Sequence, residues 1–208
     1  MKQVNKLKQL ENLSYFDLAT LSQVTELEGN TLYKNISRWL KQGKIIQLKR
    51  GFYTTQHFAS KQDADSYREF LSNKLRYPSY LSLEYVLGKY QILTESVYTY
   101  TSVTQKSTRT YTNKLGTFSY RSISNSLFMG YKIIKENYFE IAIASKSKAL
   151  FDFLYLKFYR KSQINKEMID ELRLNLDEFT KEERREFSSF CKSTNRDKFF
   201  TLEKLLFN

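Results

Sequence analysis

The segment from Asn30 to Gln42 (NTLYKNISRWLKQ) constrains the fold of this chain more than any other. Its apolar residues recur at the spacing of one helical face, and they are Leu32, Ile36, Trp39 and Leu40. Asn30 is a suitable N-cap, and Gly43 is able to adopt the left-handed conformation that ends a helix. The pattern therefore predicts a helix over residues 31–42 with one buried face.

The opposite face of this predicted helix carries polar and basic side chains: Thr31, Lys34, Asn35, Arg38 and Lys41. An α-helix fits the major groove of DNA, where Arg and Asn can make paired hydrogen bonds with guanine and adenine. Lysines chiefly contact phosphates, which position a protein without reading sequence. We therefore predict that this face binds double-stranded DNA.

The flanking segments complete a recognisable pattern. A shorter helix over Phe16 to Val24 is joined to the first by a turn containing Gly29, and residues 4–13 predict a preceding helix. Downstream, residues 45–48 and 52–54 read as two strands. Their turn carries Lys49, Arg50 and Gly51, which places Lys49 and Arg50 where a wing contacts the DNA backbone. The sequence thus predicts a winged helix-turn-helix over residues 1–58.

Charge agrees with a nucleic-acid partner. The chain has 34 Lys+Arg and 22 Asp+Glu, a formal net charge of +12. Residues 1–58 hold nine Lys+Arg and four Asp+Glu, so 9 − 4 = +5. The alternative is that this domain contacts another protein and that its basic face is solvated.

The sequence also predicts the location of the protein. No stretch approaches the roughly 18 apolar residues of a membrane span, and the N-terminus lacks the apolar core of a signal peptide. A single cysteine, Cys191, excludes an internal disulfide. We expect a cytoplasmic protein without a membrane partner, with Cys191 as a buried structural thiol.

Residues 59–208 form the second predicted domain. A helix is expected over Ser79 to Gly88, followed by a strand-rich centre and a helix over Lys146 to Phe158. The remainder, from Ile164, predicts two or three short helices. The predicted strands are 97–103, 109–112, 116–122, 131–134 and 139–144. The fold class is therefore α+β, with a mixed α/β second domain that has an antiparallel, strand-rich centre and a helical C-terminus.

Several blocks of the chain, in order, resemble one family. They are RGFY at the predicted wing, YPSYLSLEYVLGKYQI, VYTYTSVT with TRTYTNKLGTFSYR, and IAIASKSKALFDFLYL. Across about residues 14 to 160 the sequence is similar to the AbiEi-type antitoxins, which belong to abortive-infection (AbiE, type IV) toxin–antitoxin systems.

The resemblance implies a function for each domain. The N-terminal domain would repress its own operon by binding inverted repeats in the promoter. The C-terminal domain would neutralise a cognate nucleotidyltransferase-like toxin without a stable complex, and it could add positive surface for DNA. The alternative is a stand-alone winged-helix transcriptional regulator whose C-terminal domain senses a ligand or dimerises.

The strand-rich centre is itself basic. Between Thr94 and Lys135 there are six Lys+Arg and one acidic residue, so 6 − 1 = +5. These cations could extend a DNA footprint along phosphates, or they could be solvated charges that keep a sheet edge from pairing. The candidates for an additional DNA or partner surface are Lys106, Arg109, Lys114 and Arg121.

Residue types give little support to catalysis. His57 is the only histidine, which disfavours a Ser-His-Asp set, and no phosphate-binding loop motif occurs. We expect no enzyme activity, no catalytic residue, no cofactor and no metal site, with a metal-dependent nuclease as the competing hypothesis. Asp152 interrupts an apolar stretch, and we interpret it as a buried carboxylate that pairs with a basic residue.

Overall fold

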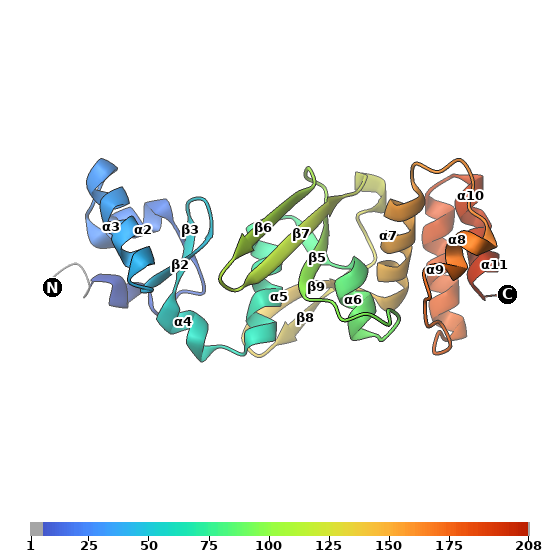
Figure 1. Cartoon of the computed structure of the whole chain (residues 1–208), viewed down its shortest axis with the longest axis horizontal. Coiled ribbons are helices and arrows are strands. Elements are labelled where there is room, and N and C mark those ends of the chain that lie inside the picture. The colour runs from blue at the N-terminus through green and yellow to red at the C-terminus, as the bar shows by residue number, and fades with distance from the viewer. Residues whose placement is uncertain (1–5, 208) are drawn as a thin grey trace. The chain divides into compact units, whose positions relative to one another are not determined.

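The structure is a computed structural model that describes residues 6–207. The chain forms two compact units of mixed α and β structure (Figure 1). The first runs to Arg68 and takes in residues 111–117, and the second comprises residues 69–110 and the chain from Phe118 onward. Residues 56–61, which span the predicted domain boundary after residue 58, form a helix that the Thr55 side chain caps by accepting a hydrogen bond from the Phe58 N–H at 3.0 Å.

The first unit contains short helices and a three-stranded antiparallel sheet of order β1-β3-β2. Its elements are the 3-10 helix η1 (Lys8–Leu10), β1 (Phe16–Asp17), α2 (Leu18–Thr25), α3 (Gly29–Lys41), β2 (Ile45–Lys49), β3 (Phe52–Thr55), α4 (Gln56–Lys61) and the start of α5 (Ala64–Leu75). Residues 4 and 5 of the first expected helix lie outside the described residues.

One hydrophobic core holds this unit together. Trp39 is fully buried at its centre, and the residues packed with it are Leu7, Leu10, Phe16, Leu21, Leu32, Ile36, Ile45 and Tyr53. Leu40 is partly buried against the same cluster. The apolar stripe predicted for the helix at 31–42 therefore faces the core, as its spacing indicated.

The second unit contains most of a six-stranded sheet of order β6-β7-β5-β4-β9-β8, of which residues 111–117 are grouped with the first unit. Its strands are β4 (Ser79–Leu81), β5 (Thr99–Thr104), β6 (Arg109–Asn113), β7 (Gly116–Ser122), β8 (Tyr131–Glu136) and β9 (Phe139–Ala144). The expected antiparallel arrangement needs one correction, because β4 pairs with β9 in parallel at Leu81 and Ile143. The helix expected over Ser79 to Gly88 is also corrected, since Ser79–Leu81 joins the middle of the sheet and α6 begins only at Leu83.

The further helices of this unit pack on the sheet or on one another, and they continue beyond it toward the C-terminus (Figure 1). They are α6 (Leu83–Lys89), the short η2 (Asn125–Leu127), α7 (Lys146–Phe158), α8 (Lys166–Asp170), α9 (Lys181–Ser193), α10 (Asp197–Phe200) and α11 (Leu202–Phe207). Helices α7 and α9 lie against each other. Between Ile164 and Phe207, the last described residue, the chain thus forms four helices rather than two or three.

A buried ion pair lies within α7, and its carboxylate links the helix to the sheet through hydrogen bonds. Lys148 Nζ lies 2.5 Å from Asp152 Oδ1, and neither side chain is exposed. Asp152 Oδ2 accepts hydrogen bonds from Tyr80 at 3.0 Å and Ser82 at 2.8 Å, both from the β4 segment. The interpretation of Asp152 as a buried carboxylate paired with a base is confirmed. Ser82 is the N-cap residue of α6, and it is buried where its hydroxyl supplies one of these hydrogen bonds.

Candidate nucleic-acid interface

Helix α3 is fixed at both ends by backbone hydrogen bonds. Its N-cap is Glu28 rather than the expected Asn30, because the Leu32 N–H already bonds to the Glu28 carbonyl at 3.2 Å. At the other end Gly43 has φ +65°, and the N–H groups of Gly43 and Lys44 donate back to Leu40 and Trp39. These paired bonds are a Schellman motif, which confirms the predicted role of Gly43.

The outward face of α3 presents most of the residues expected to bind DNA. Thr31, Lys34, Arg38 and Lys41 are all exposed, opposite the buried stripe. Tyr33 and Ser37 are exposed on the same helix. The arrangement offers hydroxyl, ammonium and guanidinium donors along one helix, and these groups suit phosphates and base edges.

Asn35 does not present its side chain to solvent as the predicted DNA-binding face requires. It is half-buried, and its Nδ2 donates to the Thr31 carbonyl at 2.9 Å. Its Oδ1 accepts a hydrogen bond from Arg38 Nη2 at 2.5 Å. Because both ends of the amide are used within the helix, Asn35 braces Arg38 instead of presenting a free amide to a base.

The β2–β3 turn carries the other two predicted residues. Arg50 is exposed at its tip, beside Gly51 with φ +74°. Lys49 is half-buried, with Nζ 4.9 Å from the centroid of the Phe52 ring, and Phe52 stacks on Tyr15 at 4.6 Å. A cation held over an aromatic ring keeps its charge but loses freedom. The turn thus offers two cations: Lys49, whose ammonium group lies over an aromatic ring, and Arg50, which is exposed.

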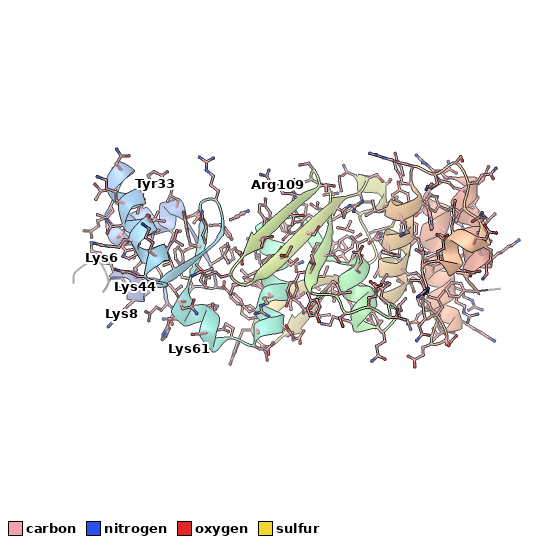
Figure 2. The ribbon with its side chains drawn as sticks, in the orientation of Figure 1. Lys6, Lys8, Tyr33, Lys44, Lys61 and Arg109 are labelled. Carbon is pink, nitrogen blue, oxygen red and sulfur yellow. The ribbon has the colours of Figure 1, made fainter. Side chains whose placement is uncertain are left out.

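Tyr33 is a candidate that sequence reasoning missed. Its side chain is 56% exposed on the N-terminal half of α3 (Figure 2). Burial, and to a smaller extent the charge of Tyr33, raise the pKa of Tyr53 above its usual value. The sequence offered one sign of this role. Tyr33 is an aromatic residue that does not fall at the spacing of the buried apolar face of the helix.

Two other lysines of the first unit, Lys6 and Lys44, are less available than their charge suggests, whereas Lys8 and Lys61 are exposed. Figure 2 labels Lys6, Lys8, Lys44 and Lys61 on this unit. Lys6 forms an ion pair with Glu26 at 2.6 Å and donates to the Thr25 carbonyl. Lys44 is half-buried after the end of α3. The exposed faces of α3 and the turn therefore remain the main candidate surface.

The four basic candidates in the strand-rich centre do not share one face. The hydroxyls of Thr110 on β6 and Ser119 on β7 form a hydrogen bond of 3.4 Å, so these two side chains lie on the same side of the sheet. Strand alternation then places Arg121 on that side and Arg109 on the other. Lys106 lies in the β5–β6 turn of the second unit, whereas Lys114 lies in the β6–β7 turn, within residues grouped with the first unit.

The thiol of Cys191 is accounted for by burial. Cys191 is buried, and burial raises the pKa of its thiol to about 12, so the thiolate is scarce at neutral pH.

Within residues 6–207, no three His, Cys, Asp or Glu side chains are grouped so that they could hold a metal ion. No helix in this described part of the chain is long and apolar enough to cross a membrane.

Comparison with known proteins finds no matching family model and no matching curated protein.

Proposed function

We propose that the chain is a DNA-binding antitoxin that represses its own operon and neutralises a nucleotidyltransferase-like toxin. The observation that carries the DNA-binding part is the two-sided character of α3. One face is buried in the core through Leu32, Ile36 and Trp39, and the other presents Lys34 and Arg38 to solvent. A helix anchored in this way can enter a groove without losing its own packing.

The arrangement of α2, α3 and the β2–β3 ribbon supports assigning the first unit as a winged helix-turn-helix. Helix α3 has 13 residues, so its length is about 20 Å, enough to lie across the major groove. The ribbon follows it directly and carries Arg50 at its tip. In this proposal α3 reads the promoter, and Lys49 and Arg50 contact phosphates.

The antitoxin part of the proposal rests on the resemblance to the AbiEi-type family. Most of the resembling blocks fall in the second unit, on β4 to β7 and on β9 with α7. We propose that this unit antagonises the toxin and that no stable complex is required. The inverted repeats of the promoter would be the DNA partner.

A cell-based experiment tests both parts. The neighbouring reading frame is expressed alone and with the full chain, while a reporter driven by the upstream promoter is measured. We expect restored growth and reduced reporter output. Growth that is never restored argues against the antitoxin function, whereas an unrepressed reporter argues against autoregulation.

A pocket in the second unit favours the second candidate function, a ligand-sensing regulator. Its volume is about 860 Å³, and basic and acidic side chains line it together, including Arg121, Lys157, Arg173, Glu84 and Glu171. A regulator of this kind would repress the promoter yet fail to rescue cells from the neighbouring gene product. The same experiment therefore separates the two functions.

A further inference from the structure

Strand β8 is an edge of the six-stranded sheet. In the part of the chain that the structure describes, β8 pairs only with β9, through the register from Tyr131 with Ala144 to Glu136 with Phe139. An edge strand leaves a row of backbone N–H and C=O groups open to another strand. The outer side of β8 is therefore a template for one more strand.

Strand β8 exposes a large apolar side chain among its charged residues. Ile133 is 68% exposed, and its cross-strand neighbour Ala142 is too small to cover it. The opposite edge, β6, has Thr and Arg side chains in the exposed positions of Arg109–Asn113. Proteins commonly protect edges with charge, and β8 carries exposed Lys132, Lys135 and Glu136. The exposed Ile133 at the middle of the strand is nevertheless an apolar site on which a second strand could pack.

The charges on β8 are complementary to a second copy of β8. Lys132 and Glu136 are four residues apart, which puts them on one face of the strand. Both are exposed, and neither makes an ion pair with any residue between 6 and 207. In an antiparallel pair centred on Ile134, Lys132 of each copy lies opposite Glu136 of the other. Opposite charges directly across a ladder stabilise it, and like charges destabilise it.

Symmetry limits the possible registers. In a dimer whose twofold axis is normal to the sheet, residues that lie opposite each other in the two copies must come from the same face of β8. The register centred on Ile134 meets this condition. Ile133 then lies opposite the aliphatic part of Lys135, with the second Ile133 as its diagonal neighbour. This register gives an apolar contact on one face and two ion pairs on the other.

We propose that β8 pairs with β8 of a second copy of the chain, antiparallel and centred on Ile134, to give a dimer with one continuous twelve-stranded sheet. A pair of six-residue strands is a small interface. The dimer is therefore weak, with a Kd on the order of micromolar.

Sedimentation velocity of the full chain over a wide concentration range tests the proposal. We expect a reversible monomer–dimer equilibrium. Ile133→Lys and, separately, Lys132→Glu should each weaken it by about tenfold or more, since each brings unfavourable charge to the pair. Combining Lys132→Glu with Glu136→Lys should restore the dimer, because the charge pairs are exchanged.

Thr110→Lys on the opposite edge strand, β6, is the matched control and should leave the equilibrium unchanged. All substituted positions are exposed, so thermal melts should match the wild type. A wild-type chain that stays monomeric at its highest soluble concentration overturns the proposal. A dimer insensitive to Ile133→Lys, or one that the charge exchange fails to restore, also overturns it.

Discussion

Arg38 is braced by Asn35, one turn earlier on helix α3, through a hydrogen bond of 2.5 Å from Nη2 to Oδ1. Asn35 is itself fixed, because its amide donates to the Thr31 carbonyl at 2.9 Å. A guanidinium that is held before binding loses less conformational freedom when it meets a base or a phosphate. Asn35 therefore acts in the proposed interface by positioning Arg38.

Replacing Asn35 with Ala should weaken promoter binding by about 1 kcal/mol, the usual net contribution of a hydrogen bond. Arg38→Ala should cost more, about 1–3 kcal/mol if Arg38 contacts a base. The losses of binding free energy should not add in the double variant, because Asn35 acts through Arg38. Fluorescence anisotropy with promoter DNA measures all three. Full additivity would show that the brace is irrelevant to binding.

Lys41 should act differently from Arg38. As a predicted phosphate contact, Lys41→Ala should weaken binding to promoter and to scrambled DNA by the same factor. It should also reduce the slope of log affinity against log salt by about 0.9, the contribution of one phosphate. Titrations at several salt concentrations check this. A selective loss on promoter DNA would instead assign Lys41 to base recognition.

The buried pair of Lys148 and Asp152 should control the stability of the second unit. Burial raises the pKa of Asp152 and lowers that of Lys148, and the attraction between the two opposes both shifts. Lys148→Met should destabilise by about 3–5 kcal/mol, since it leaves a buried carboxylate without its cation.

The double variant Lys148→Met with Asp152→Leu provides the control. It should be more stable than Lys148→Met alone, because no uncompensated charge stays buried. Urea unfolding followed by circular dichroism measures both variants. If the double variant is less stable than Lys148→Met, the hydrogen bonds that Asp152 accepts from Tyr80 and Ser82 stabilise the fold by more than the unpaired buried carboxylate destabilises it.

Asp17 should make the stability of the first unit depend on acid pH. It caps α2 by accepting hydrogen bonds from the Thr20 N–H at 2.8 Å and the Thr20 hydroxyl at 2.9 Å, which lower the pKa of its carboxyl below the usual 3.8. This stabilisation is complete above the unfolded pKa and is lost as the pH falls through the folded pKa.

Asp17→Ala should therefore cost about 1 kcal/mol near neutral pH and progressively less in acid. Trp39, the only tryptophan, lies in the core of this unit and reports its unfolding by fluorescence. Urea titrations of both proteins across acid pH provide the comparison. A difference that stays constant down to strongly acid pH would show that the carboxylate charge does not matter.

Local pattern predicted α3, α7 and most strands, whereas α9 is longer than the short helices expected after Ile164. The expected helix over Lys146 to Phe158 matches α7, and the expected strands 116–122 and 139–144 match β7 and β9. Each has enough residues for its periodicity to be distinct, and a long apolar stripe specifies a helix without reference to distant partners.

Errors arose where distant pairing decides the structure. Phe16 was expected to start a helix, but it pairs with Tyr53 and forms β1. Ser79–Leu81 is too short to show a period, and its position between β5 and β9 makes it a strand. For the candidate interface, the exposed face of α3 was predictable from spacing. The use of Asn35 within the helix depends on rotamers that spacing does not determine.

The central claim is that the outer face of α3 binds the promoter, and one measurement tests it most directly. Anisotropy titrations compare the wild type with Lys34→Ala/Arg38→Ala and with a control, Lys181→Ala/Arg185→Ala. The control removes one lysine and one arginine at the same spacing from exposed positions of α9, another 13-residue helix. We predict at least about tenfold weaker binding for the α3 variant and wild-type affinity for the control. Equal affinity of the α3 variant and the wild type would contradict the account.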